Sequence, residues 1–510
     1  MTRIGRGDVV AAVRAAVGRG DDVEVGRLIA AHPIEIWFGM TPADVHDVVD
    51  SLRPGVLPAN SVAAFLMTMA SGEPLEGRIA SDPAWAAALV ADEQLRTAYV
   101  FLQATQARVA GDPVRAYEIL APLIASPPRS RLYRDTSGGL DAMVLLQAAL
   151  AAALAGFVRE AMALYDRVLL NAPREPALAF FIREAYVRSA LLMGLYGDRA
   201  DARARLQHAR EVERTGSWVE HLLDAEAVLV DALLAPPEDH RAAVERVLAL
   251  PLQYVGEQWP YYVSVLHRLT VATGLRARGR ERIETLEASG IAPPPGVASG
   301  LPGSVFAIAY AWDDLMTGDT AAARAQLDRA DPTLIATRLL SALHAVFTGA
   351  TQRALQLSRA VSVDTRGFEQ VESMRLTVIA AAHFVANERD EAAVALHLLA
   401  PLLDTHTISF LRGLSVELAQ FAADNVVGWP RLDDVPVGPS VVGLLDGGLL
   451  TARELDVLRG LAAGRSREEV AAALFLSVNT VKTHQQSLYR KLKVSSGSAA
   501  VAEGIRRGLV

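Results

Sequence analysis

The sequence predicts an all-α protein: a long α-solenoid of helical hairpins followed by a small, basic domain of short helices. Three observations lead to this fold class. Apolar segments that end at a glycine recur through residues 1–426. Long apolar runs such as 144–154 are rich in alanine and leucine rather than in the β-branched residues of strands. All three lysines of the 510-residue chain lie close to its C-terminal end, which marks 449–510 as a separate domain after a linker at 427–448.

The repeating unit is a long apolar helix that ends near a glycine, with an alanine five residues later inside a second helix. Glycine adopts left-handed backbone at a helix end without strain, and asparagine is the other residue that tolerates it. The small alanine allows the paired helices to approach closely. The pairs are Gly111/Ala116, Gly156/Ala161, Gly197/Ala202, Gly318/Ala323, Gly349/Ala354 and Asn387/Ala392.

The spacing of these turns predicts stacked hairpins. Neighbouring turns lie 45, 41, 31 and 38 residues apart, and helices at 218–234 and 261–275 are expected to fill the 121-residue gap after Gly197. A repeat of about 40 residues made of helix, turn and helix is typical of α-solenoids. We therefore expect about ten hairpins. The alternative is an ordinary, non-repeating helical bundle.

Two segments are predicted to lie outside the repeats. Residues 292–303 (APPPGVASGLPG) cannot form a regular helix, so we expect a long loop that interrupts the array. Residues 427–448 contain three prolines and five glycines and have little helical patterning. This segment is the expected hinge between the two parts. Its apolar residues 441–445 predict that part of it docks on a neighbouring surface.

Stacked hairpins create a concave groove, and such grooves bind peptides, proteins or small molecules. The most ligand-like feature of the array is the aromatic cluster of Trp259, Tyr261 and Tyr262. Tryptophan and tyrosine commonly anchor recognition, so these residues are candidates for lining a ligand or partner groove. The alternative is that aromatic residues at helical spacing belong to the core.

The C-terminal domain carries start and stop signals for three helices. Two S/T-x-x-E capping boxes, a glycine stop and a further serine cap divide the segment. In chain order these signals are Thr451/Glu454, Gly464, Ser466/Glu469 and Ser477. The result is a short helix, a tight turn and a longer basic helix, which is the helix-turn-helix arrangement.

The third helix of this domain has one apolar and one polar face. The apolar side is formed by Val481, His484, Leu488 and Leu492, and the outward side by Lys482, Thr483, Gln486, Ser487 and Arg490. Lysine can bond guanine and glutamine can bond adenine in the major groove of DNA. Arginine and lysine toward the end of the helix, at 490 and 491, suit phosphate contacts. The alternative is an ordinary solvated helix face.

The stretch LLTARELDVLRGLAAGRSREEVAAALFLSVNTVKTHQQSLYRKLKV resembles the LuxR/GerE-type helix-turn-helix of bacterial transcription regulators. The resemblance covers about fifty residues and implies a fourth helix at 494–508, often a dimerisation surface. It implies base reading by Lys482, Thr483 and Gln486, and phosphate contacts from Ser477, Asn479, Thr480, Arg490 and Lys491. Two residues depart from the family pattern: Lys493 replaces the usual glycine and Gly497 the usual arginine.

The rest of the chain resembles divergent tetratricopeptide repeats. Large LuxR regulators carry an ATPase ahead of a helical-repeat sensor, and this chain resembles that arrangement with the ATPase missing. Since no lysine precedes Lys482, a Walker A loop and Schiff-base chemistry are excluded upstream. The chain has no cysteine and no H-E-x-x-H motif. We therefore expect no cofactor, no metal site and no enzymatic activity.

Charge and hydropathy complete the functional expectation. Residues 449–510 hold ten basic and five acidic side chains, about +5, which leaves 40 basic and 53 acidic residues, or −13, for the remainder. A basic module on an acidic body suits a phosphate-binding end. The uncharged run 142–158 falls short of the roughly 20 apolar residues of a membrane span. We expect a cytoplasmic protein with no membrane partner.

The leading hypothesis is a sequence-specific transcription regulator whose solenoid senses an unknown small-molecule or protein effector. Expected partners are double-stranded DNA with an inverted repeat, a second copy of the chain in a homodimer, and RNA polymerase. The alternative is an interaction scaffold whose helix-turn-helix tail mediates dimerisation alone.

Overall fold

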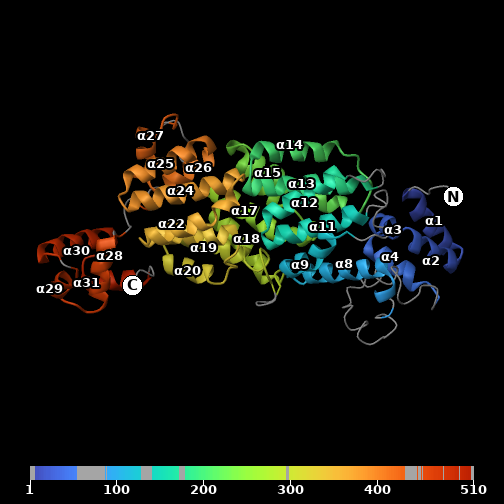
Figure 1. The fold of residues 1–510 in the computed structure, drawn as a ribbon, viewed down its shortest axis with the longest axis horizontal. Helices are drawn as coiled ribbons and strands as arrows, with labels where there is room; N and C mark the ends of the chain where they lie inside the picture. The colour runs from blue at the N-terminus through green and yellow to red at the C-terminus, as the bar shows by residue number, and fades with distance from the viewer. Residues whose placement is uncertain are drawn as a thin grey trace.

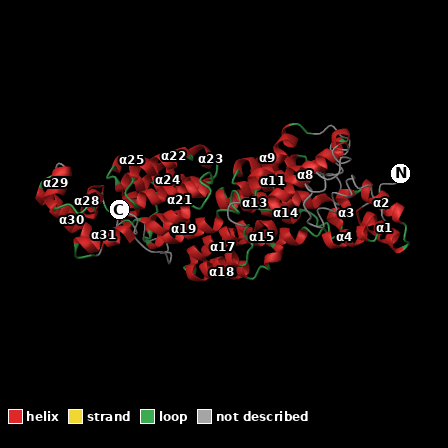
Figure 2. Cartoon of the chain, turned by 90° about the horizontal axis from the view of Figure 1, so that it is seen from below, coloured by secondary structure: helices red, strands yellow, loops and turns green. Residues whose placement is uncertain are grey.

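The computed structural model describes residues 6–53, 87, 89–127, 140–171, 178–293, 298–430, 445, 450, 452–474, 476–492, 494–506 and 510. Within these ranges the chain is helical and contains no strand (Figures 1 and 2). The helices form an elongated array, with the N-terminal helices at one end and the C-terminal domain at the other (Figure 1). The predicted all-α fold class is confirmed.

The helices occur in sequential antiparallel pairs. The N-terminal helices are α1 (Arg6–Gly18), α2 (Asp22–Ala31), α3 (Pro33–Gly39) and α4 (Pro42–Asp50). The first group of hairpins consists of α8 (Glu93–Val109) with α9 (Pro113–Ala125), α11 (Leu140–Ala155) with α12 (Val158–Leu170), α13 (Ala179–Tyr196) with α14 (Arg199–Glu211), α15 (Glu220–Leu234) with α16 (His240–Leu248), and α17 (Trp259–Thr273) with α18 (Arg276–Ala288).

A second group of hairpins follows the predicted loop. It consists of α19 (Val305–Thr317) with α20 (Thr320–Leu327), α21 (Ile335–Phe347) with α22 (Thr351–Ala360), the short α23 (Ser362–Thr365), α24 (Glu369–Val385) with α25 (Arg389–Leu399), and α26 (Thr405–Leu414) with α27 (Val416–Asn425). Short 3₁₀ turns occupy connections: η3 (Pro237–Asp239), η4 (Leu252–Tyr254), η5 (Gly256–Gln258) and η6 (Ala400–Leu402).

The turn pattern predicted from glycine and alanine spacing is confirmed in its main features. Left-handed backbone occurs at four of the predicted glycines and at Asn387, with φ between +62° and +92°. All six paired alanines are fully buried between their helices. Gly197 is the exception, because its φ of −109° lies outside the left-handed region. A side chain there would instead meet Met193, whose Sδ lies 2.8 Å from the position of an added Cβ.

The gap between Gly197 and Gly318 holds two hairpins, as expected. Neither has the predicted pairing of a glycine turn with an alanine five residues later. The α15/α16 connection is a proline-containing turn around η3. The α17/α18 turn places Gly274 in left-handed backbone, and a glycine, Gly279, stands five residues later where other repeats have alanine. A Cβ at Gly279 would lie 2.2 Å from Oγ1 of Thr270, so this crossing excludes even alanine.

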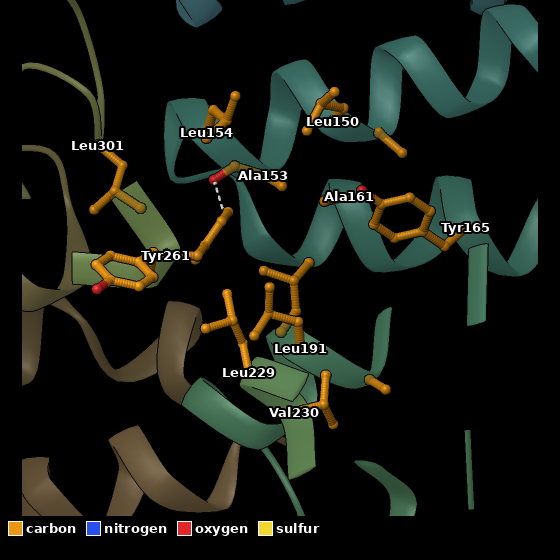
Figure 3. Packing of buried hydrophobic residues seen from close by; sticks show 14 of the residues in the cluster. Leu150, Ala153, Leu154, Ala161, Tyr165, Leu191, Leu229, Val230, Tyr261 and Leu301 are labelled. Atoms are coloured by element: carbon orange, nitrogen blue, oxygen red, sulfur yellow. Dashed lines mark hydrogen bonds between the residues drawn. The ribbon is translucent and has the colours of Figure 1, made fainter. Parts of the chain in front are cut away.

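The predicted aromatic groove at Trp259, Tyr261 and Tyr262 is wrong, because these side chains are buried in the core of the first group of hairpins. Tyr262 is fully buried, and the Tyr261 hydroxyl donates a hydrogen bond of 2.8 Å to the carbonyl of Ala153 (Figure 3). Trp259 stacks on Phe306 with ring centroids 5.4 Å apart. The aromatic spacing therefore marks the contact between α17 and its neighbours.

The loop at 292–303 is confirmed over its described part, and it docks on earlier hairpin turns. The amide of Ser299 donates to the carbonyl of Gly111 (2.9 Å), and that of Leu301 donates to the carbonyl of Leu154 (2.8 Å). Gly300, with φ +58°, lies so close to this backbone that a Cβ would be 2.6 Å from the oxygen of Leu154. The loop therefore ties the second group of hairpins to the first.

Further contacts fold the array back on itself, so the early and late hairpins meet. Arg159 of α12 donates to the carbonyls of Val363 and Arg366, at 3.1 and 2.6 Å.

Arg188 forms ion pairs with Glu184 and Glu226 in the interior, where all three side chains are buried. Buried ion pairs of this kind hold neighbouring helices in register, since an unpaired partner would be costly.

The N-terminal helices have a small core of their own, centred on residues such as Val13, Leu28 and Val45. They cap the first group of hairpins through backbone carbonyls of α3. Ser217 Oγ donates to the carbonyl of Phe38 at 2.8 Å, and Trp218 Nε1 donates to that of Trp37 at 2.9 Å.

Of the helices that the structure describes, none is long and apolar enough to cross a membrane. The same ranges contain no group of three or more histidine, aspartate or glutamate side chains placed to hold a metal ion.

Candidate nucleic-acid interface

The C-terminal domain consists of α28 (Ala452–Ala462), α29 (Arg467–Leu474), α30 (Val478–Leu492) and α31 (Gly497–Arg506), at the far end of the array (Figure 1). Helix α28 ends at Ala462, and the predicted stop residue Gly464 follows it with a φ of +72°. The amide of Gly464 donates to the carbonyl of Leu461, and the amide of Arg465 donates to that of Gly460, which satisfies carbonyls at the helix end.

The capping signals before α29 and α30 are confirmed. Ser466 Oγ accepts from the amide of Glu469 at 3.2 Å, and the Glu469 carboxylate accepts from the amide of Ser466 at 2.7 Å. This backbone hydrogen bond lowers the pKa of Glu469. Ser477 Oγ accepts from the amide of Thr480 at 3.0 Å and starts α30. The first predicted box involves Thr451, which lies outside the described residues.

A compact core fixes which face of α30 turns outward. Val481, Leu488 and Leu492 are buried against residues of α28, α29 and α31. His484, predicted as a core histidine, is half-buried. The domain has a hydrophobic cluster distinct from those of the solenoid, so its helices are positioned by their own packing.

The outward face of α30 carries the residues predicted to read bases. Lys482, Thr483 and Gln486 are all exposed in the intact chain. Thr483 donates its hydroxyl to the carbonyl of Asn479 at 3.1 Å, which leaves the hydroxyl oxygen able to accept. Lysine and glutamine on one exposed helix face, followed along it by a cation, suit insertion into a major groove.

The five predicted phosphate contacts divide into three groups. Arg490 and Asn479 are exposed and turned outward. Ser477 and Thr480 form the helix cap, with their hydroxyl oxygens 2.7 Å apart. Lys491 differs from the prediction, because its ammonium donates to the carboxylate of Glu454 at 2.7 Å and is 22% exposed.

The Lys491–Glu454 pair shows why the position of a lysine near a helix end does not decide its role. The side chain of Glu454 is only 4% exposed, and its Oε2 accepts from Lys491 of α30. A buried carboxylate requires a partner, and the nearby ammonium supplies one. This pair joins α28 to α30, so the charge of Lys491 is used inside the domain.

Gln485 is a buried residue of the domain that the sequence pattern did not single out. Its side-chain oxygen accepts from Arg467 of α29 at 2.9 Å, and its amide donates to the Tyr489 hydroxyl at 2.7 Å. The same hydroxyl lies 3.1 Å from where a Cβ at Gly497 would be placed. Glycine at 497, where the family usually has arginine, therefore leaves room for Tyr489. The feature of the sequence that could have identified Gln485 is a glutamine on the inner side of an amphipathic helix.

Two further exposed arginines extend the basic surface beyond the predicted residues. Arg465 and Arg467 flank the cap of α29, next to the N-terminal end of that helix. Helix N-termini and arginines both favour phosphate. Lys493 lies outside the described residues.

Comparisons with known proteins agree with this geometry. Residues 448–503 match the family described as "Bacterial regulatory proteins, luxR family". The chain is similar to the probable transcriptional regulatory protein NarL of Mycobacterium tuberculosis, with 45% identity over 14% of this chain and 39% of that protein. It is also similar to a nitrate/nitrite response regulator protein homolog of Haemophilus influenzae, with 53% identity over 10% of this chain and 24% of that protein.

A longer but weaker match is to the transcriptional regulatory protein LiaR of Bacillus subtilis, 30% identical over 22% of this chain and 56% of LiaR. The chain thus spans 39% of the length of NarL and little more than half of LiaR. The C-terminal domain is a LuxR-family helix-turn-helix domain.

Proposed function

We propose that this chain, which ends in a LuxR-family domain, is a sequence-specific transcription regulator that acts in the cytoplasm without enzymatic activity. The observation that carries the proposal is the exposed outer face of α30. Lys482, Thr483 and Gln486 stand together on it, while the opposite face is fixed by the core of the domain. A rigid helix with free base-reading groups is what direct readout of a major groove requires.

The solenoid is proposed to sense an effector and to control where the DNA-binding domain is held. The linker supports this, because its described residue Leu445 is buried against α26 and α27 and its amide donates to the carbonyl of Leu414 at 2.7 Å. Five residues later, the oxygen of Leu450 lies 3.2 Å from the position of a Cβ at Gly349. Movement in the last hairpins would therefore be transmitted to the domain.

Control of where the DNA-binding domain is held fits the exposure of its base-reading side chains better than control by covering them. The base-reading side chains are exposed while the solenoid is present, so this arrangement does not bury them. Isolated helix-turn-helix units contact few base pairs, and paired units read two half-sites about one helical turn apart. We propose a homodimer on an inverted repeat, with RNA polymerase as a further partner. The solenoid would set the separation of the two domains.

Selection of bound sequences from a random duplex library tests this function. The full chain and the fragment 438–510, which contains the core of the domain, are compared in parallel, and circular dichroism confirms that the fragment is folded. Enrichment of one inverted repeat by the full chain is the expected result, and it also gives the half-site spacing. If neither protein enriches a sequence while the fragment is helical, the proposal fails and the tail serves dimerisation in a scaffold.

A further inference from the structure

Four cationic or titratable side chains meet where the early hairpins contact the late ones. Arg199 and His240 are the first residues of α14 and α16, Arg268 lies in α17, and His406 lies in α26. The rings of His240 and His406 stack with centroids 5.1 Å apart and planes 17° apart. Up to 207 positions of sequence separate these residues. The cluster therefore forms only because early hairpins of the solenoid contact late ones.

The two arginines are satisfied by neutral groups. Arg268 donates to the carbonyl of Leu195 at 3.2 Å and to the side-chain oxygen of Gln370. Arg199 donates to the carbonyl of Ala235 at 3.3 Å. Within the described ranges, neither guanidinium forms an ion pair with a carboxylate. Burial lowers the pKa of Arg268 to about 10, which indicates a positive charge poorly compensated by its surroundings.

Asp404 is the carboxylate of the cluster, and only one of its oxygens is used. Oδ1 accepts from the amide and the hydroxyl of Thr407, both at 2.7 Å, and caps α26. Oδ2 is buried and accepts no hydrogen bond from any residue that the structure describes. Burial, followed by the nearby Arg268, lowers the pKa of His406 to about 4, and burial also lowers that of His240. With both histidines neutral, two arginines and one aspartate leave a formal charge of +1.

We propose that this cluster is the effector site of the solenoid and binds a small organic anion through Arg199 and Arg268. The ligand carries a carboxylate or phosphate, and the free Oδ2 of Asp404 accepts a hydrogen bond from a hydroxyl or amine on the same molecule. Arg199, Arg268, Asp404 and His406 are half-buried, so they are neither sealed in the core nor fully solvated. Arginine pairs in such partly desolvated positions bind planar anions strongly.

The site is placed to influence the DNA-binding domain. Asp404 and His406 stand at the start of α26, and the carbonyl of Leu414 at its end accepts the hydrogen bond that anchors linker residue Leu445. A ligand that is held by the two arginines and draws Asp404 toward itself would shift α26 and the anchor with it. This inference rests on the proposed function for its regulatory role, whereas anion binding is independent of it.

Isothermal titration calorimetry of the full chain tests the binding step, with inorganic phosphate, succinate and malate as probes at constant ionic strength. Phosphate stabilises proteins non-specifically, and a shift in Tm keeps rising as RT ln(1 + [L]/Kd), so the measured quantity is the Kd of each probe. Arg199→Gln and Arg268→Gln are expected to raise it by about tenfold or more, the loss of a charge-assisted hydrogen bond. Arg324→Gln is the matched control, since Arg324 is exposed on α20 and paired with Asp328 at 2.7 Å; it should leave the value unchanged.

The outcomes separate the parts of the proposal. Titrations that show no saturable binding of any probe, or a Kd that is unchanged in Arg199→Gln, overturn the site. Arg199 lies at a helix end, so its variant serves even where Arg268→Gln fails to fold. Malate is expected to half-saturate below succinate, and equal values would remove Asp404 from the site. Saturable binding that leaves the DNA affinity of the full chain unchanged overturns the effector role. Failure of both the full chain and the folded fragment 438–510 to select a DNA sequence overturns the proposed function and leaves the anion site standing.

Discussion

Arg490 and Lys491 are neighbours at the end of α30, yet their side chains have different surroundings. The guanidinium of Arg490 is exposed, with Ser487 Oγ at 3.5 Å as its described contact. The ammonium of Lys491 bonds the buried carboxylate of Glu454. A cation in solvent is available for a phosphate, whereas a cation that neutralises a buried carboxylate is part of the fold. The two residues should therefore fail in different ways when they are replaced.

We expect Lys491→Met to destabilise the C-terminal domain by about 1.5–3 kcal/mol, the usual range for a hydrogen bond to a charged group. The physical reason is that the buried carboxylate of Glu454 would lose the positive charge that now bonds its Oε2. Urea unfolding followed by circular dichroism of the fragment 438–510 measures the loss. Arg490→Met is the matched control and should leave the free energy of unfolding nearly unchanged. Equal stability of both variants would show that the Lys491–Glu454 pair contributes nothing.

Lys482→Ala should weaken binding to the cognate site by about 1–3 kcal/mol and relax preference at one base pair. The reason is the loss of a side chain that stands free on the outer face of α30. Competition binding against cognate and random duplexes measures both effects.

Arg490→Ala provides the contrast for Lys482→Ala. It should weaken binding to all sequences and reduce the slope of log K against log salt by about 1, since a phosphate contact releases counterions without reading sequence. Equal losses on cognate and random DNA for Lys482→Ala would contradict base reading by that residue.

At the level of helices, most hairpins bury a small residue between their two helices, either an alanine or a glycine. Most turns pair a left-handed residue with an alanine that is fully buried between the helices. The α17/α18 hairpin replaces that alanine by Gly279, because Thr270 of the facing helix occupies the space. Thr270 is itself buried, and its hydroxyl donates to the carbonyl of Leu266 at 2.8 Å. A larger residue on one helix is thus offset by a smaller one on the other.

Gly279→Ala is expected to destabilise the solenoid by about 1–3 kcal/mol, the usual cost of overpacking a close helix crossing. Urea unfolding of the full chain measures it. In a double-mutant cycle, Thr270→Ala should remove part of the cost, because it deletes the hydroxyl oxygen 2.2 Å from the added methyl group, while the Cβ of residue 270 stays 2.8 Å away. If Gly279→Ala costs the same with either residue at 270, the loss arises from the backbone and the packing explanation is wrong.

At the level of the whole molecule, the linker is an anchored connection. Leu445 is 9% exposed and contributes to the same hydrophobic cluster as Leu414 and Leu418 of the last hairpin. The sequence predicted that apolar residues at 441–445 would dock, and Leu445 confirms it, while 441–444 lie outside the described residues. A domain tethered five residues from a buried anchor has far less freedom than one on a free linker of the same length.

Leu445→Asp should release this anchor, because a carboxylate cannot be buried in an apolar cluster without a partner. Limited proteolysis of the full chain is expected to cut within 430–450 faster in the variant, and the radius of gyration from small-angle scattering should increase. Exposed Leu398→Asp is the control, since its side chain already faces solvent. Unchanged proteolysis in Leu445→Asp would show that the anchor does not hold the domain.

The sequence by itself determined the all-α class, the positions of most hairpin turns and the exposed polar face of α30. These features depend on local rules: glycine or asparagine for left-handed backbone, serine for a helix cap, and a 3.6-residue period for the buried face. Ser466, Ser477 and Gly464 act within a few residues of themselves, so their roles were readable.

Only the tertiary structure decided which residues meet across the chain. It buried Tyr261 rather than exposing it, joined Lys491 to Glu454, and brought Arg199, Arg268 and His406 together at the closure of the array. Such contacts depend on the total rotation that accumulates from one hairpin to the next along the solenoid. No local sequence pattern encodes this total rotation. The fold class and the exposed polar face of α30 are local properties of this chain, whereas its interior polar clusters depend on the contact between early and late hairpins.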